Sequence, residues 1–500
     1  MATNSERPRG RANERRSPDR WQQLYTGASG HLLSDRRNTL YHIDPRCKDE
    51  GVRKRIDPIA RSNDTVGLQA PSRVTEHENR NALSLTSRIV LLLICCAVGV
   101  YMWLAVRLYV AHRLSTFNDP VSLQRAIRLE PRDANNYDLL GQYFMWAAQD
   151  PKAAAGRFQQ AVKLNPYMSS YWTHLAQAES NLGNDSEQTA AIRRAIAVDP
   201  TTPELAWSAA NFFLIQGDTD SALDQFAVVI RNDPRMVEAA LERSWRAVGQ
   251  VDPIQRRLPP DPEIYLSLVR LLVVRQQWAQ AQQIWLAMLH LNRQFDARAA
   301  VFYVDALLAA RDVPAAQKVW QQIVDASTNL KPYLAPVNLV VNPGFEHEFL
   351  NAGFDWHYSA QNGVAMILDP TQTHEGSEAL LITYSGAPNG DAGISQPIPV
   401  TPGVAYIASA WVKSEELETA NGPQLTVFDA NRNLALARSD ETLGSTGWHQ
   451  VQATFTAPKE TNLVIVRFSR EPASTRIQGK FWIDSVNMTQ NTGETTEQVH

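Results

Sequence analysis

The chain has 500 residues, of which 44% are hydrophobic and 20% are charged, and its net charge is −4. This length predicts two or more domains, because one hydrophobic core rarely serves more than about 300 residues. The mild negative charge excludes bulk attraction to nucleic acid, and the three cysteines, two of them adjacent, exclude a disulfide framework.

Residues 1–88 form a basic tail with 17 Lys and Arg against 11 Asp and Glu. Large apolar residues are scarce there, so the composition predicts a mostly disordered segment. The arginine clusters at 9–16 and 46–55 have the charge to touch anionic lipid or nucleic acid. A solvated arm without a specific partner is the alternative that the composition favours.

The segment Ile89–Val106 has eighteen residues without a charge. As a helix it would span about 27 Å, close to a bilayer core of about 30 Å, and we predict a transmembrane helix over residues 89–111. A buried core helix is the alternative. The segment starts too late for a secretory signal, so it predicts a permanent single-pass anchor. The positive tail favours a cytoplasmic N-terminus and an extracytoplasmic remainder in a bacterial inner membrane, although the nearest flanking arginines balance.

Residues 116–330 have the pattern of paired amphipathic helices. Helix-ending prolines recur at Pro166, Pro200 and Pro234, each 34 residues after the last. The first unit carries Tyr137, Leu140, Gly141 and Phe144, then Ala154 and Phe158, with one extra residue in its turn. These residues resemble the tetratricopeptide repeat (TPR), and about five or six repeats are expected, with a break near residues 248–263.

The resemblance implies a solenoid with a groove that binds peptides or partner proteins. A plain solvated surface is the alternative for each position. The groove-lining residues that it implies are Asn135, Asp138, Gln142, Thr173, Gln177, Asn181, Trp207 and Asn211.

Residues 338–489 have a period of two, which predicts an antiparallel β-sandwich. In residues 448–458, for example, Val451, Ala453 and Phe455 share one face. The order of motifs from "NPGFE" at Asn342 to "FWIDSVNMT" at Phe481 resembles jelly-roll carbohydrate-binding modules of bacterial glycoside hydrolases. The last residues, 490–500, are expected to be flexible.

The resemblance implies sugar binding by aromatic rings, and purely structural or protein-binding sandwiches are the alternative. We predict Trp356, Tyr358 and Trp411 as carbohydrate-binding candidates, whereas Trp448 and Trp482 match framework positions. Such modules often hold a structural calcium ion, and the matching oxygen donors are Glu346 and Asp484. Simple surface acidity is the alternative for these two carboxylates.

The sequence offers no motif for catalysis. It has no Gly-rich phosphate loop, nucleophile elbow or Cys/His metal cluster, and its acidic pairs are ordinary surface features. We therefore predict a multidomain, non-enzymatic, membrane-anchored TPR scaffold with a glycan-binding-like sandwich, acting in assembly or export of surface polysaccharide. A protein–protein adaptor and an accessory subunit of a separately encoded glycan-active enzyme are the alternatives.

Overall fold

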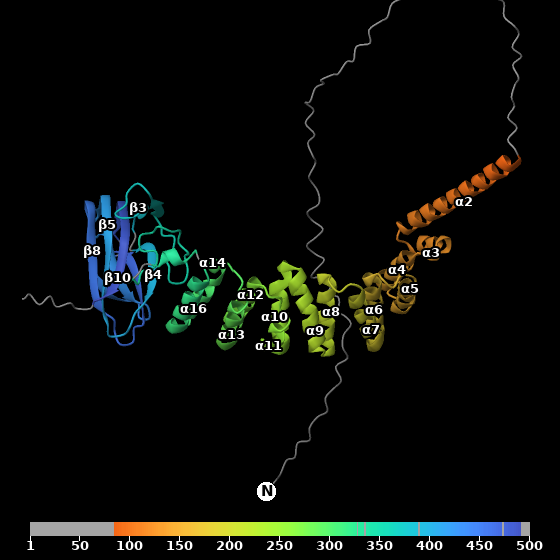
Figure 1. Ribbon diagram of the computed structural model, residues 1–500, viewed down its shortest axis with the longest axis horizontal. Helices are drawn as coiled ribbons and strands as arrows, with labels where there is room; N and C mark the ends of the chain where they lie inside the picture. Colours follow the sequence, from red (N-terminus) through yellow and green to blue (C-terminus); the bar gives the residue numbers. More distant parts are fainter. Residues whose placement is uncertain (1–84, 328, 335–336, 389–390, 473–474, 492–500) are drawn as a thin grey trace, which may run out of the picture. The chain divides into compact units, whose positions relative to one another are not determined.

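The computed structural model describes residues 85–491, except 328, 335–336, 389–390 and 473–474. The chain forms two compact units, which divide between Val198 and Asp199 (Figure 1). The predicted flexible ends, 1–88 and 490–500, lie almost entirely outside the described residues.

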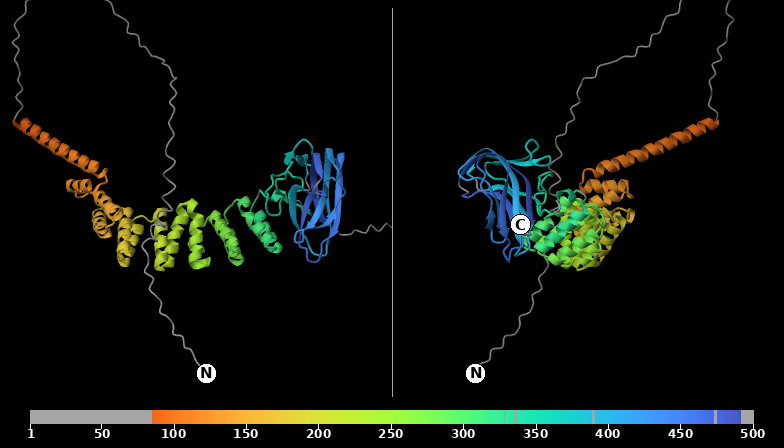
Figure 2. Two further views of the ribbon diagram at one scale, coloured as in Figure 1. Left: turned by 180° about the vertical axis from the view of Figure 1, so that it is seen from behind. Right: turned by 60° about the vertical axis from the view of Figure 1, so that its left-hand side comes forward.

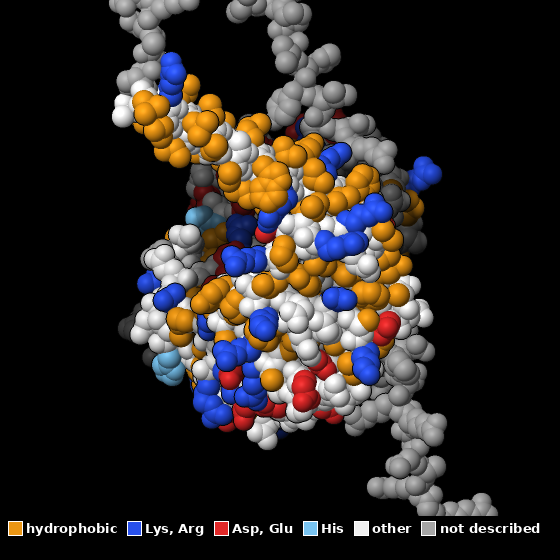
Figure 3. Space-filling model, turned by 90° about the vertical axis from the view of Figure 1, so that its right-hand side faces the viewer, with side chains coloured by type: hydrophobic (Ala, Val, Ile, Leu, Met, Phe, Trp, Pro, Cys, Tyr) orange, Lys and Arg blue, Asp and Glu red, His pale blue; other side chains and the backbone are white. Residues whose placement is uncertain are grey.

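The N-terminal unit begins with helix α2, Leu85–Ser115. This helix is long and apolar enough to cross a membrane, and none of its apolar window is buried. Figure 3 shows hydrophobic side chains over the surface of this helix. It extends beyond the predicted 89–111 at both ends, so residues 85–88 are helical and do not belong to a disordered tail.

The last turns of α2 pack against α3, Pro120–Leu129. Small residues make this contact close, because Ala111 and Ser115 of α2 are buried, as are Leu123 and Ala126 of α3. The long apolar helix α2 therefore forms the first helical hairpin together with α3.

Two further hairpins complete the N-terminal unit. Their elements are α4 (Ala134–Gln142) with the π-helical turn η2 (Tyr143–Ala147), α5 (Pro151–Leu164), α6 (Ser169–Leu182) and α7 (Asp185–Val198). The π-helical turn accommodates the extra residue that the sequence shows in this repeat. Gly141 lies where α4 crosses α5, and a Cβ there would be 2.6 Å from Phe158. The close approach explains why this position of the repeat holds a glycine.

The C-terminal unit continues with stacked helical hairpins (Figure 2). Its helices are α8 (Pro203–Gln216), α9 (Thr219–Asn232), η3 (Pro234–Met236), α10 (Val237–Val248), α11 (Asp252–Gln255), α12 (Pro262–Val274), α13 (Trp278–Leu289), α14 (Ala297–Ala300), α15 (Phe302–Ala309), α16 (Val313–Ala326) and η4 (Lys331–Tyr333). The second helix of the α10–α11 hairpin is reduced to four residues. This short second helix explains the predicted break in the 34-residue period.

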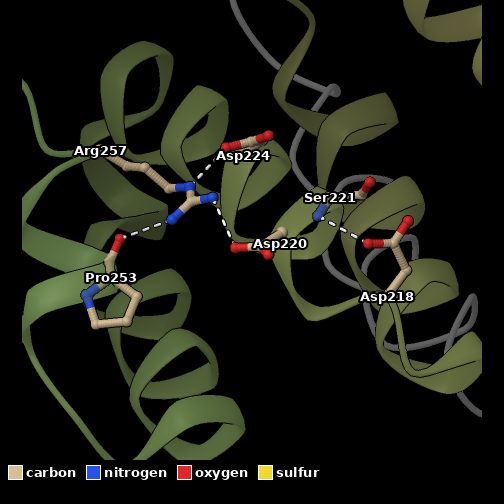
Figure 4. A network of polar contacts seen from close by, with 6 residues as sticks. All are labelled: Asp218, Asp220, Ser221, Asp224, Pro253 and Arg257. Atoms are coloured by element: carbon tan, nitrogen blue, oxygen red, sulfur yellow. Dashed lines mark hydrogen bonds and ion pairs between the residues drawn. The ribbon is translucent and has the colours of Figure 1, made fainter.

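Arg257 secures the shortened repeat to the preceding hairpin (Figure 4). Its Nε donates to Asp224 at 2.5 Å and its Nη2 donates to Asp220 at 3.0 Å, both on α9. Its Nη1 donates to the carbonyl of Pro253 on α11 at 3.0 Å. One guanidinium group thus connects α9 with α11 where a full second helix is missing.

Two antiparallel five-stranded sheets form the predicted sandwich. One sheet has the order β1-β4-β9-β6-β7 and the other has the order β2-β3-β10-β5-β8. The strands are β1 (His357–Tyr358), β2 (Val364–Asp369), β3 (Ala379–Pro388), β4 (Asp391–Pro399), β5 (Ala405–Thr419), β6 (Gln424–Asp429), β7 (Leu434–Arg438), β8 (Gly444–Thr456), β9 (Leu463–Ser469) and β10 (Arg476–Gln490). Alternate residues from both sheets form one core, including Ile382, Tyr406, Val466 and Phe481.

The beginning and the end of the sandwich are joined. The side chain of Asn338 donates to the carbonyl of Val486 at 2.9 Å and accepts from the N–H of Met488 at 3.0 Å. The N–H of Leu339 donates to the carbonyl of Met488. The first residues of the domain therefore lie along its last strand.

The loop before β1 packs against the last helices of the C-terminal unit. The N–H of Gly353 donates to Asp305 of α15 at 2.6 Å. Phe354 meets the ring of Trp320 on α16 edge-on, with 6.0 Å between the ring centroids. Arg298 of α14 pairs with Glu348 at 3.2 Å. Residues 348–354 thus connect the sandwich to the final hairpin.

Candidate functional site

The outer side of the sheet β1-β4-β9-β6-β7 carries a row of polar side chains. The strand register places Ser395, Arg467, Thr426 and Arg438 in one row across four neighbouring strands. Thr426 alternates with the core residues Leu425 and Val427, yet it is 0% exposed. The outward side chains around it must therefore enclose it, and we call this surface the Arg467 face.

Arg467 is the central side chain of this face. Its guanidinium carbon lies 3.6 Å from the ring centroid of Phe428, and its Nη1 lies 3.4 Å from Asp391. Its Nε is buried and has no hydrogen-bond partner among the described residues. Burial raises the pKa of Asp391. The hydrogen bond from the N–H of Gly393 and the charge of Arg467 lower this pKa, but they offset only part of the rise. The face thus combines an aromatic ring, a partly unsatisfied guanidinium group and a carboxylate.

This combination suits a polyhydroxylated ligand. Guanidinium and carboxylate groups form paired hydrogen bonds with neighbouring hydroxyls, and an unsatisfied buried donor gains most from a new partner. Arg467 covers one side of the half-buried Phe428 ring, so a sugar would contact the part of the ring that the guanidinium group leaves open. The alternation of residues 463–469 places Arg467 on the side opposite the core residue Val466, so the sequence held the signal for this residue, which we did not predict.

The outer side of the other sheet carries the predicted Trp411, and the ring of His374 covers one side of this indole. The His374 ring stacks on Trp411 with 3.9 Å between centroids and an interplanar angle of 14°. Trp482 is 2% exposed, donates to Asp369 at 2.8 Å and lies near Lys413. A sugar would have to displace His374 to reach the covered side of Trp411.

The structure contradicts the prediction that Trp356 binds a sugar. Its ring is 0% exposed in the sandwich core, packs on Phe345 at 5.1 Å and donates to the carbonyl of Asn342 at 3.0 Å. Tyr358 is 40% exposed on the edge strand β1. The three predicted aromatic residues therefore lie in three separate places, because alternation in sequence reveals a strand but not which loops cover it.

The two predicted calcium ligands converge on the loop of residues 374–378. Glu346 accepts from the N–H groups of Ser377 at 2.9 Å and Glu378 at 3.3 Å. Asp484 accepts from the N–H groups of His374 at 2.8 Å and Glu375 at 3.1 Å. Because N–H donors face these oxygens, the donor set fits a calcium ion only in part. No cluster of three His, Cys, Asp or Glu side chains suited to a metal occurs within the described residues.

Glu346→Gln is expected to destabilise the sandwich by about 1 kcal/mol at pH 7, because it weakens the hydrogen bonds that hold the 374–378 loop. Burial raises the pKa of Glu346, but hydrogen bonds from Ser377 and Glu378 outweigh burial and lower it. The contribution is therefore present above the ordinary value of 4.5 and is lost as the pH falls below it.

Thermal unfolding in EDTA and in calcium tests both carboxylate roles. The variant should melt below the unmodified protein in EDTA, and equal melting temperatures would contradict the loop-holding role. A calcium-dependent rise in the unmodified protein that Glu346→Gln lacks would support the predicted metal site.

The predicted groove residues of the N-terminal unit surround a polar triad. Asp138 is 3% exposed and bonds His174 at 2.7 Å and the side chain of Gln142 at 2.7 Å. Trp146, which we did not predict as a groove residue, meets His174 edge-on and is 51% exposed. Asn135 and Asn181 are exposed, and Thr173 and Gln177 are half-buried. The groove side thus offers amide groups, an oriented imidazole and an exposed indole.

In the C-terminal unit, the predicted groove residues Trp207 and Asn211 take part in helix packing. Trp207 is half-buried and meets Phe226 of α9 edge-on at 5.5 Å. Asn211 is buried and its amide donates to the carbonyl of Trp207 at 2.8 Å. A ligand role for these two residues stays a prediction.

Comparison with known proteins matches the sandwich to a family. Residues 337–475 match the family model of a carbohydrate binding domain. No curated protein sequence matches the chain. The chain is similar to the crystal structure of the CBM22-1-GH10 modules of Clostridium thermocellum endo-1,4-beta-D-xylanase 10B complexed with xylohexaose. That match is 17% identical, covers 31% of this chain and 29% of that chain, and has a TM-score of 0.24.

Two helical proteins are also similar to the chain. YrrB, described as a TPR protein with an unusual peptide-binding site, is 12% identical over 41% of this chain and 92% of its own, with a TM-score of 0.21. Pseudomonas aeruginosa PilF is 16% identical over 46% of this chain and 91% of its own, also with a TM-score of 0.21. The chain thus has helical hairpins followed by a C-terminal two-sheet sandwich, and residues 337–475 of its C-terminal part match a carbohydrate binding domain.

Proposed function

We propose that this protein is a non-enzymatic, membrane-anchored scaffold that binds a glycan through its sandwich and a protein or peptide through its repeats. The observation that carries the glycan part is the match of residues 337–475 to a carbohydrate binding domain. The Arg467 face supplies chemistry that suits this role, with a ring and charged hydrogen-bonding groups on neighbouring strands. Assembly or export of surface polysaccharide is the process that would use this combination.

Helix α2 would anchor the protein. Its apolar side chains are exposed along the window that is long enough to cross a bilayer. Trp103 lies one turn before Arg107, whose guanidinium group sits 5.4 Å from the indole centroid, a pairing suited to a membrane interface. The basic tail would remain in the cytoplasm, and the repeats and the sandwich would lie outside the inner membrane.

The groove side of α4 and α6 would hold an extended peptide. Gln142 and Gln177 offer amide groups for hydrogen bonds to a peptide backbone. Trp146 offers an exposed apolar ring beside His174, which Asp138 holds in one orientation. A calcium ion shared by Glu346 and Asp484 would stabilise the sandwich without taking part in chemistry.

Two matched aromatic substitutions test the glycan part. Phe428→Ala is expected to reduce glycan affinity at least about tenfold, because it removes the ring under Arg467. Trp411→Ala, on the other sheet, should leave affinity within about twofold. The measurement is calorimetric titration of the detergent-solubilised full chain with a panel of soluble bacterial and plant polysaccharides.

The outcome separates three interpretations. A loss with Trp411→Ala alone would place the site on the face that the sequence predicted. Failure of the unmodified protein to bind any glycan of the panel would contradict the glycan part and favour the protein-adaptor alternative.

A further inference from the structure

The end of α3 is fixed beside the point where the apolar part of α2 stops. Arg107 is the first charged residue after the apolar segment, and its Nη2 donates to Glu130 at 2.8 Å. Glu130 is the C-terminal cap of α3. Because α3 runs back along α2 after the turn at residues 116–119, its C-terminal end lies at the same level as Arg107.

This ion pair limits how deeply α2 can enter a bilayer. Deeper insertion would carry both Arg107 and Glu130 into hydrocarbon, where charged groups are costly. Shallower insertion would leave apolar residues such as Val106 in water. The boundary between hydrocarbon and headgroups is therefore expected near Arg107.

Three arginines of α3 and the following loop lie just outside this boundary. Arg125 and Arg128 are exposed and share one helical face, and Arg132 is exposed two residues after Glu130. With a rise of ~1.5 Å per residue, Arg128 lies about 3 Å and Arg125 about 8 Å above the level of Glu130. The headgroup layer is about 5–7 Å thick on each side of a bilayer, so these side chains reach it. We call these three residues the arginine stripe.

The nearby carboxylates offset only part of the charge of the arginine stripe. Arg107 pairs with Glu130. Asp119 and Asp133, the N-caps of α3 and α4, keep their negative charges, so two carboxylates stand against the three arginines. The stripe therefore presents net positive charge where a membrane would present headgroups.

We propose that the arginine stripe binds the headgroups of anionic phospholipids and so fixes the orientation of the first repeat against the membrane. The inference rests on the proposed membrane anchor, because α2 brings the stripe to the surface. The α2–α3 contact transmits the restraint, since Ala111, Ser115, Leu123 and Ala126 bury their side chains there and the helix continues past Arg107 without a break.

The experiment measures which lipid gathers around α3 in the full chain. The protein carries Cys47→Ser, Cys95→Ala and Cys96→Ala, and a donor fluorophore is attached through Gln124→Cys on the exposed side of α3. It is reconstituted in nanodiscs of mixed phosphatidylcholine and phosphatidylglycerol. A trace acceptor fluorophore is placed on the acyl chain of one lipid or of the other.

Energy transfer to phosphatidylglycerol is expected to exceed transfer to phosphatidylcholine about twofold, and the excess should vanish near 1 M salt, where the Debye length is about 3 Å. Arg125→Gln with Arg128→Gln should equalise the two transfers. The control pair Arg194→Gln with Arg231→Gln removes two exposed arginines from α7 and α9 and should preserve the excess.

The anchor and the stripe fail in different ways. Equal transfer to both lipids from an inserted, unmodified chain would contradict lipid binding by the arginine stripe and would favour an anionic protein as its partner. The proposed membrane anchor would not be affected by that result. Recovery of the chain free of nanodiscs would overturn the anchor and the stripe together.

Discussion

Alanine at position 353 is expected to lower the free energy of unfolding of the C-terminal unit by about 3 kcal/mol. Gly353 has φ of 65°, and a Cβ there would lie 2.7 Å from Val301 and 2.8 Å from Trp320. Trp320 is buried in α16 and cannot move aside without opening the contact between the sandwich and the last hairpin. The methyl group therefore adds a steric clash to a strained backbone.

Gly403→Ala is the matched control for backbone strain. Gly403 has φ of 79°, but a Cβ there would meet nothing within 4 Å. We expect this substitution to cost about 1 kcal/mol, so the difference between the two variants measures the clash alone. Chemical unfolding followed by tryptophan fluorescence makes the comparison, and equal losses would show that the Gly353 contact does not tie the sandwich to the helices.

At neutral pH the buried, ionised Asp355 is expected to lower the free energy of unfolding by about 3 kcal/mol, and Asp355→Asn should remove this pH-dependent loss. Asp355 is 0% exposed, its Oδ2 accepts from the N–H of Leu350 at 2.6 Å, and its Oδ1 has no partner among the described residues. Burial raises the pKa of Asp355 to about 6, and the N–H groups of Leu350 and Trp356 and the charge of Arg298 oppose only part of this rise.

The sign follows from the raised pKa. The folded protein binds this proton more tightly than the unfolded chain, so the contribution of Asp355 to stability is most favourable below the ordinary value of 3.8 and declines until the pH passes about 6. The free energy of unfolding of the unmodified protein should therefore decline relative to Asp355→Asn between pH 4 and pH 7.5. Urea unfolding of both proteins at these two pH values measures the change, and parallel pH profiles would contradict it.

The sequence predicted the repeats well because their physics is local. Pro166, Pro200 and Pro234 each follow the second helix of a hairpin, and the motif residues Gly141 and Phe158 meet within one hairpin. In the sequence, the shortened helix α11 is visible only as a break in the 34-residue period. A long-range contact takes the place of the missing helical turns, and such a contact leaves no local pattern. Arg257 is more than 30 residues from its partner Asp224, and no local pattern predicts that pair.

The strands of the sandwich could be predicted from the sequence, but the candidate binding site could be predicted only in part. Alternation in β5, β8 and β9 follows from one buried face, but exposure of the other face depends on loops from elsewhere in the sequence. The loop carrying His374 covers Trp411, and Trp356 enters the core rather than solvent. The row through Arg467 depends on pairing between strands that are distant along the chain.

The joined beginning and end of the sandwich make it a transplantable module. Asn338 bonds to Val486 and Met488, so the two positions at which the module would be excised are neighbours in space. Domains whose termini are adjacent can be inserted into a surface loop of another protein without opening their own core. For the same reason, an affinity tag fused after Gln490 would emerge close to Asn338 and hence close to the segment that follows α16.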